Sequence, residues 1–213
     1  MTRTFLYIFT FLFLSSCGKG GGGNSTESAG LTELTEAQIA SETAPVQALT
    51  FDINANLSGF EKDHEEKIFS AFDLIKQVIA SDEFKRRVLG YTYKGKKQFV
   101  DNNGDSNSQV YKKILEASEK LSSSKNNTMD LDLESYYTKK NVIGYTMPSI
   151  KAIFINRRYL DKKSFKSNQV AMNLTHEWLH KLGYKHAQKN NSSRPHSVPY
   201  AIGYIIREIS AKI

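Results

Sequence analysis

The stretch His176-Glu177-Trp178-Leu179-His180-Lys181-Leu182-Gly183-Tyr184-Lys185-His186 holds three of the five histidines of this 213-residue chain. An α-helix turns by about 100° per residue, so His176 and His180 project from one side of a helix, one turn apart. Glu177 follows His176 by about 100° and lies beside the two imidazoles. Apolar side chains occupy the rest of the helix surface: Leu174, Trp178, Leu179 and Leu182. One face is therefore predicted to pack and the other to present two imidazoles and a carboxylate.

Gly183 is expected to end this helix, because glycine adopts positive φ at little cost. A sharp turn there returns His186 towards the helix as a third nitrogen donor. Three neutral imidazoles leave a fourth tetrahedral position open for water, which is typical of a catalytic zinc site. The pattern therefore predicts that His176, His180 and His186 bind Zn²⁺.

These residues match the HExxHxxGxxH signature, and the chain resembles the metzincin clan of zinc endopeptidases. The resemblance covers residues 49–213 in element order and residues 176–186 in specific positions. It implies a zincin-like α+β fold with a mixed twisted sheet, an active-site helix and a C-terminal helix. It also implies a peptide or protein substrate and Glu177 as the general base.

The chain departs from this clan at the methionine-containing turn, because no methionine follows Met172. The segment His196-Ser197-Val198-Pro199-Tyr200 looks like the Ser-x-Met-x-Tyr turn of the astacin branch, matched only at its tyrosine. Val198 then takes the methionine position as an apolar floor. Tyr200 is a candidate catalytic residue that binds zinc or the developing oxyanion, the alternative being packing at a helix start.

The first 16 residues are predicted to be a secretory signal. Arg3 is followed by an apolar run over residues 5–14, which is shorter than the roughly 20 residues that span a bilayer. The form resembles a bacterial lipoprotein signal, in which Cys17 becomes the lipidated first residue. The alternative is an ordinary signal peptide with an incidental cysteine. Gly18 after the lipidated residue favours the outer membrane by the same resemblance.

Residues 17–48 are predicted to be the lipidated cysteine and a flexible tether, because they begin with five glycines between residues 18 and 23. The single cysteine excludes a disulfide framework. The formal net charge of +7 comes from dispersed lysines and arginines, without an arginine-rich tract. The favoured interpretation of this charge is a solvated surface, and the next is attraction to anionic envelope surfaces; no nucleic-acid partner is expected.

Hydrophobic periodicity predicts the elements of the domain at residues 49–213. Strands are expected at 49–53, 87–93, 129–137, 142–147 and 152–156, and helices at 60–81 (capped by Ser58), 108–121, 168–182 and 200–213. The strand at 142–147 is the candidate edge strand above a substrate cleft. A substrate would pair with it in extended form.

Three other features carry weaker predictions. Residues 101–107 place oxygen side chains at alternate positions, as a calcium loop does. However, Gly104 takes the fourth position and not the sixth, and Lys112 stands at the twelfth, where such a loop needs a bidentate glutamate, so a polar turn is favoured. His196 is expected to be a loop residue, with a ligand role as the alternative. His64, in the charged first turn of a predicted helix, is expected on the surface.

The function expected from these patterns is zinc-dependent hydrolysis of peptide bonds by a monomer anchored to the bacterial cell envelope. Two alternatives use the same residues. One is a non-catalytic zinc-binding envelope lipoprotein that holds a peptide or protein partner in the cleft. The other is amide hydrolysis on cell-wall peptides.

Overall fold

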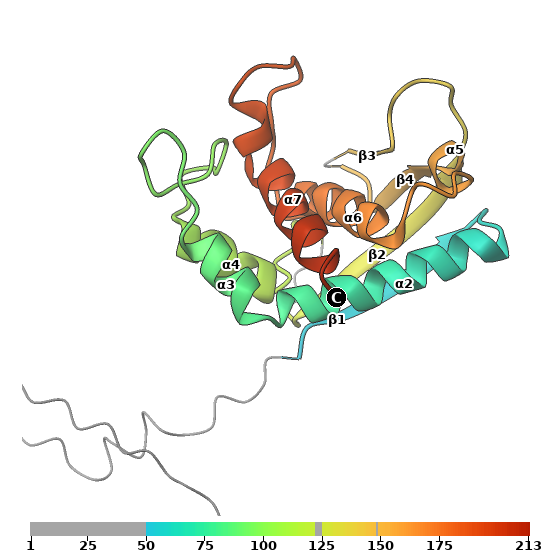
Figure 1. Cartoon of the computed structure of the whole chain (residues 1–213), viewed down its shortest axis with the longest axis horizontal. Helices are drawn as coiled ribbons and strands as arrows, with labels where there is room; N and C mark the ends of the chain where they lie inside the picture. The colour runs from blue at the N-terminus through green and yellow to red at the C-terminus, as the bar shows by residue number, and fades with distance from the viewer. Residues whose placement is uncertain (1–49, 122–124, 148) are drawn as a thin grey trace, which may run out of the picture. The chain divides into compact units, whose positions relative to one another are not determined.

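The computed structural model describes residues 50–121, 125–147 and 149–213, which hold a mixed sheet and its helices (Figure 1). The predicted signal at 1–16, Cys17 and the tether at 17–48 lie outside the described residues. The unit that includes the sheet spans Val46–Ile213. None of the helices in the described ranges is long and apolar enough to cross a membrane.

The sheet has four strands in the order β1-β2-β4-β3, and β3 lies at one edge. The first three are mutually parallel, and β3 runs antiparallel to β4. The strands are β1 (Asp52–Ser58), β2 (Thr128–Tyr136), β3 (Gly144–Thr146) and β4 (Ala152–Asn156). Leu133 pairs with both Leu57 and Ile153, and Tyr145 lies opposite Phe154.

One face of the sheet is apolar and covered by helices, because alternate residues of a strand point to the same side. The inward-facing residues of β2 and β4 are buried: Met129, Leu131, Leu133, Ile153 and Ile155. The opposite face is polar along β1 and the first part of β2. There Asn54 donates a hydrogen bond to Asp130 at 3.1 Å and Asn56 donates one to Asp132 at 2.9 Å.

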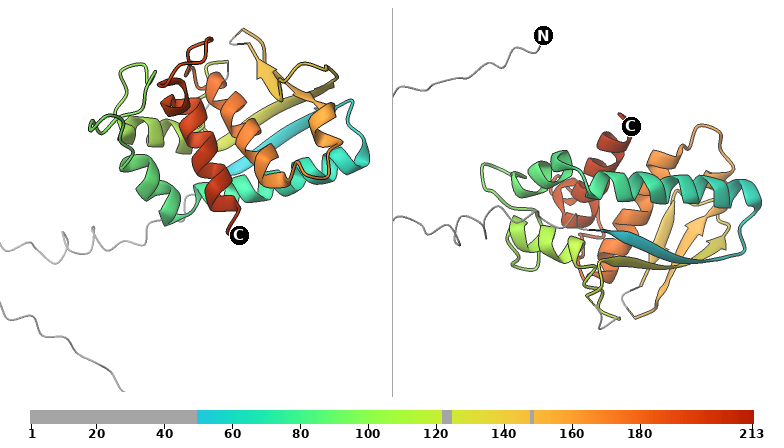
Figure 2. Two further views of the ribbon diagram at one scale, coloured as in Figure 1. Left: turned by 45° about the horizontal axis from the view of Figure 1, so that its top comes forward. Right: turned by 90° about the horizontal axis from the view of Figure 1, so that it is seen from below.

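The helices lie over and beside this apolar face (Figures 1 and 2). They are α2 (Lys62–Ile79), α3 (Asp82–Leu89), α4 (Asn107–Leu115), α5 (Arg157–Leu160), α6 (Ser167–Lys181), α7 (Val198–Ser210) and the short 3-10 helix η1 (Arg194–His196). Seen from below, α2 runs along the sheet (Figure 2). The fold is mixed α and β, compatible with the α+β class that the sequence predicts.

Helices α6 and α7 pack closely because Gly203 has no side chain at their contact. A Cβ placed on Gly203 would lie 3.1 Å from the carbonyl oxygen of Met172 and 3.7 Å from the Cβ of His176. On the other side of α6, the indole of Trp178 is fully buried and meets Phe51 edge-on, with ring centroids 6.0 Å apart. The helix that carries the histidines is therefore held on two sides.

Several predicted elements differ from the structure. Residues 87–93 are not a strand, because Ser81 caps α3 by accepting a hydrogen bond from the amide of Phe84 at 3.1 Å. Phe84 and Val88, one turn apart, form the buried side of that helix. Ser58 ends β1 instead of capping α2, which starts at Lys62.

The boundaries of other elements also shift. The predicted strand at 49–53 is placed at Asp52–Ser58, and the helix expected at 108–121 ends at Leu115. Leu121 is largely exposed, so the apolar stripe does not extend to it. The predictions for β2, β4 and α6 are confirmed to within one residue at each end, and α7 starts two residues earlier and ends three earlier than expected.

The surface location expected for His64 is wrong. The residue is buried, and its Nε2 lies 2.8 Å from Oδ1 of Asp161. The reason is its helical phase, because His64 starts the stripe that continues through Ile68 and Ile75 into the core. The polar neighbours of His64 hid this periodicity in the sequence.

Candidate metal centre

The C-terminus of α6 ends in the turn that the sequence predicts. Gly183 has a φ of +96°, its amide donates to the carbonyl of His180 at 3.0 Å, and the amide of Tyr184 donates to the carbonyl of Leu179 at 3.1 Å. This pair of hydrogen bonds is a Schellman motif, which needs a residue with positive φ after the last helical turn. The motif reverses the chain and brings His186 back beside the helix.

The three histidines converge into a group that could hold a metal ion. One ring nitrogen of each of His176, His180 and His186 lies within 4.8 Å of the others. Nitrogens bound to a tetrahedral zinc at 2.0–2.1 Å are about 3.3 Å apart. Closing the cluster around an ion therefore requires shifts of at most about 1.5 Å, within the reach of small side-chain rotations.

Burial keeps the imidazoles of His176 and His180 in the state that binds metals. It lowers the pKa of His176 well below 6.5, and the neighbouring imidazoles of His180 and His186 lower it further. The pKa of His180 is also lowered, mainly by burial. Metal ions bind neutral imidazole, so protons compete weakly for these two residues at neutral pH.

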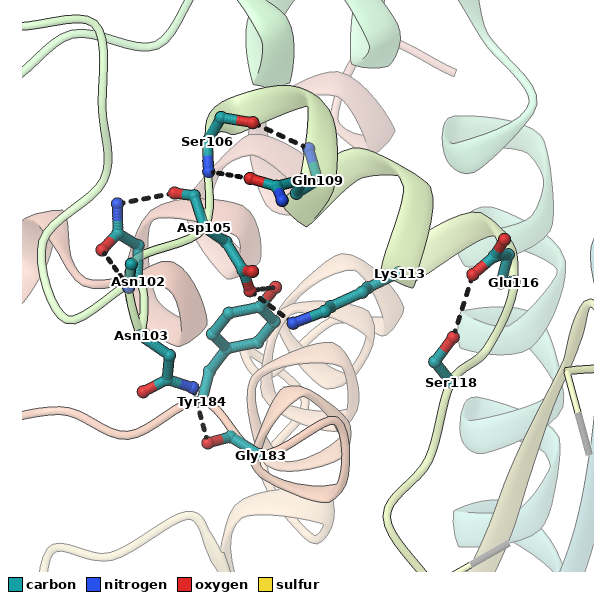
Figure 3. Close-up of polar contacts among 11 residues, drawn as sticks. Asn102, Asn103, Asp105, Ser106, Gln109, Lys113, Glu116, Ser118, Gly183 and Tyr184 are labelled. Carbon is teal, nitrogen blue, oxygen red and sulfur yellow. Dashed lines mark hydrogen bonds and ion pairs between the residues drawn. The ribbon is translucent and has the colours of Figure 1, made fainter. Parts of the chain in front are cut away.

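The orientation of His180 is fixed by its backbone surroundings. Its Nδ1 lies 2.7 Å from the carbonyl oxygen of Tyr184, so Nδ1–H donates there and Nε2 is left for a metal. The hydroxyl of Tyr184 donates to Asp105 at 2.9 Å, and Lys113 forms an ion pair with the same carboxylate oxygen at 2.6 Å. The turn that carries His186 is thus connected to α4 (Figure 3).

The polar turn at residues 101–107 supports the turn that carries His186. Asn103 donates a hydrogen bond from its side-chain amide to the carbonyl of Gly183 at 3.0 Å (Figure 3). The carboxylate of Asp105 is occupied by Lys113 and Tyr184, which agrees with the turn that the sequence favoured over a calcium loop. Sequence reasoning missed this role, because no local pattern indicates that Asp105 meets a residue 79 positions away.

Glu177 lies beside the histidine cluster and is almost completely buried. Burial raises its pKa to about 8, opposed in part by Lys181, the Asn173 side chain and the Thr146 backbone. The carboxyl group thus lies next to the edge strand β3, which contains Thr146. Gly144 of β3 permits this approach, since a Cβ there would lie 2.6 Å from Oδ1 of Asn173.

Tyr200 lies beside the cluster. Its ring centroid is 4.4 Å from that of His176 and 4.9 Å from that of His186. Burial raises its pKa, so its hydroxyl keeps its proton at neutral pH and is a hydrogen-bond donor. Val198, at the start of α7, is completely buried, as expected of an apolar floor.

His196 is the last residue of η1, so it is not a loop residue as predicted, and it lies outside the cluster. Its Nδ1 is 2.8 Å from the hydroxyl of Tyr91, and its ring centroid is 4.5 Å from that of Tyr93. Among the described residues, the histidines that share a potential metal site are His176, His180 and His186.

A cleft of about 530 Å³ opens over the three histidines and Glu177. Residues 141–146, including all of β3, form one wall, and one side of α7 forms another. The segment predicted as the edge strand above the cleft therefore does border it. Sequence reasoning missed two further residues that line this cleft, Arg194 and Arg207.

No protein-family model matches this chain, and neither a curated protein nor a solved structure shows a significant match to it.

Proposed function

We propose that the protein is a zinc-dependent endopeptidase with a zincin-like fold. The observation that carries this proposal is the convergence of His176, His180 and His186 beside the buried carboxyl group of Glu177, within a cleft. Three imidazoles favour zinc over magnesium or calcium, which prefer oxygen ligands. A zinc ion retained only for structure has four protein ligands, whereas three leave a position for substrate and water.

Zinc bound here would supply a Lewis acid that polarises the scissile carbonyl and acidifies a water molecule. Glu177 accepts the proton of the attacking water as general base. It then passes this proton to the amine that leaves when the carbon–nitrogen bond breaks. A zinc ion held by the three histidines would lower the pKa of the Glu177 carboxyl group, so that this group would be ionised before the reaction.

Tyr200, beside His176 and His186, would assist the reaction. Its protonated hydroxyl donates a hydrogen bond to the carbonyl oxygen as negative charge develops there. An extended substrate pairs with β3, whose outer edge borders the cleft. The proposal thus gives each wall of the cleft a role in binding or chemistry.

The decisive experiment compares the full-length zinc-loaded protein with its Glu177→Gln variant on a mixed peptide library. The variant should retain zinc and the fold, but its turnover should fall by about 10²-fold to 10⁴-fold, the typical contribution of a general base. Glu61→Gln, an exposed substitution beside α2, is the matched control and should cleave as the wild type does. Cleaved peptides identified by mass spectrometry report the bonds hydrolysed.

A wild-type protein with full zinc that cleaves no peptide would contradict the enzyme proposal. Unchanged partner affinity in Glu177→Gln would then favour the non-catalytic zinc-binding lipoprotein. Cleavage restricted to cell-wall peptides would favour amide hydrolysis in the wall.

We also propose that a lipid on Cys17 anchors the protein to the bacterial envelope, with the outer membrane as its location. Replacing Cys17 with Ser should release the protein from the membrane fraction or leave its precursor unprocessed. Fractionation of cells expressing either form measures this. Normal processing and membrane retention of the variant would refute the lipid anchor.

A further inference from the structure

One side of α7 faces the cleft with a regular set of residues. Tyr200, Gly203, Tyr204 and Arg207 follow the spacing i, i+3, i+4, i+7 and all line the cleft. Gly203 permits the close approach to α6, and Tyr200 lies against the histidines. Neither the metal nor the hydrolytic mechanism requires a cation at Arg207, at the far end of this set.

Two arginines and one carboxyl group are found among the described residues that line the cleft. Arg194 and Arg207 line it, and Glu177 is the acidic side chain found among its described lining residues. No ion pair to a described carboxylate involves either arginine. Glu208, the nearest acidic residue in sequence to Arg207, is paired with Arg87 at 2.5 Å instead.

Both guanidinium groups lie against tyrosine rings. The Cζ atom of Arg194 lies 5.0 Å from the ring centroid of Tyr200, and that of Arg207 lies 5.3 Å from the centroid of Tyr204. Such contacts hold a guanidinium in place while its edge keeps N–H donors for a carboxylate. Arg194 donates to Asn190 at 2.6 Å, and its buried Nε has no partner among the described residues.

The distance along α7 relates these cations to the reacting bond. Tyr200 and Arg207 are seven residues apart, which corresponds to about 10 Å along a helix. An extended peptide advances about 3.3 Å per residue. Arg207 is therefore separated from Tyr200 by about the length of three extended substrate residues, whereas Arg194 lies against Tyr200 itself.

We propose that Arg194 and Arg207 make this cleft selective for peptides with a carboxylate within about three residues of the bond that is cleaved. The inference rests on the proposed peptidase function for its position relative to that bond. The carboxylate comes from an aspartate or glutamate side chain or from a C-terminus, and both present the same planar acceptor to a guanidinium. The unpaired outer edge of β3 favours an extended peptide over other anions.

The test measures binding separately from cleavage. Full-length zinc-loaded Glu177→Gln is titrated with fluorescent blocked alanine-rich peptides that contain one Glu, or one Gln at the same position, and with a peptide that has a free C-terminal carboxylate. We expect Glu peptides to bind about 10-fold tighter than Gln peptides, because charge-assisted bidentate hydrogen bonds are strong. The Glu scan locates a side-chain source, and the free C-terminus tests the other.

Adding Arg207→Gln or Arg194→Gln should reduce this preference to about 2-fold or less. Arg86→Gln, an exposed substitution on α3 without an ion pair among the described residues, is the matched control and should keep it. Circular dichroism and zinc content verify that each variant is folded and loaded.

Four results would overturn the inference. They are no peptide binding, equal affinity for Glu and Gln peptides together with no gain from a free C-terminal carboxylate, a preference that survives both arginine substitutions, or an oligonucleotide that competes as well as an acidic peptide. Failure of the peptidase proposal is distinguishable. In that case the wild type cleaves nothing, while the Glu preference in binding and its loss in the arginine variants are still measured.

Discussion

Replacing His180 with Ala should remove the zinc-dependent part of the protein's stability. The substitution deletes one of three converging nitrogen donors and the Nδ1–H bond to the carbonyl of Tyr184. At a free zinc concentration of 100 times the dissociation constant, binding to the folded state stabilises it by about 2.7 kcal/mol. For a domain of this size, that corresponds to a rise of roughly 5–10 °C in Tm.

Differential scanning calorimetry with zinc and with a chelator measures this increment, and mass spectrometry of the metal content measures stoichiometry. The wild type should bind about one zinc ion per chain, and His180→Ala should show an increment near zero. The matched control is His196→Ala, which removes an imidazole bonded to Tyr91 outside the cluster. It lowers Tm with and without zinc alike and keeps the increment.

Stoichiometric zinc and the full increment in Tm in His180→Ala would refute His180 as a zinc ligand. A wild type that melts at the same temperature in zinc and in chelator would contradict the zinc-dependent stability. If only His196→Ala lost the increment in Tm, the metal site would have to lie outside the cluster.

Three further predictions follow from the same region. Tyr200→Phe should retain zinc and lower kcat by up to about 10²-fold to 10³-fold, less than Glu177→Gln does, because one hydrogen bond to the oxyanion is lost; zinc content and steady-state kinetics measure this, and an unchanged kcat would refute it. Lys181→Met should lower the free energy of unfolding by about 1–3 kcal/mol in urea titrations. The reason is that Lys181, buried at the end of α6, donates to the carbonyl of Ile150 before β4 and, at 3.3 Å, to that of Ala152 at the start of β4. Equal stability would show that those carbonyls find other donors. In chelator, the free energy of unfolding of the wild type relative to Glu177→Gln should be highest below pH 4.5 and should fall as the pH rises through about 8. The folded state holds the Glu177 proton over that range and the unfolded chain does not, so urea titrations at pH 5 and pH 9 that give the same difference would contradict this.

The segment at 87–93 and His64 differ from the sequence predictions for the same physical reason. The segment at 87–93 contains β-branched and aromatic residues, yet the cap at Ser81 and the core contacts of Phe84 and Val88 make its first part the end of a helix. His64 is polar and is still buried, since its helical phase and Asp161 provide a place for it. In both cases packing against the core, helped at residues 81–89 by the local cap, outweighed the pattern seen in the sequence.

Local physics determined the centre of the site from the sequence alone. The i, i+4 spacing of His176 and His180 and the positive φ available to Gly183 depend only on neighbouring residues. The return of His186 follows from them, which is why this part was predictable without coordinates.

Only the tertiary structure decided what surrounds that centre. The Asp105–Tyr184 hydrogen bond joins residues that are 79 positions apart in the sequence. The indole of Trp178 donates to Glu119, which is 59 positions away. The approach of β3 to Glu177 and the entry of Arg207 into the cleft depend on strand order and on the packing of α7 against α6. No periodicity in one segment specifies which distant segment it meets, because that choice minimises the free energy of the whole packed core.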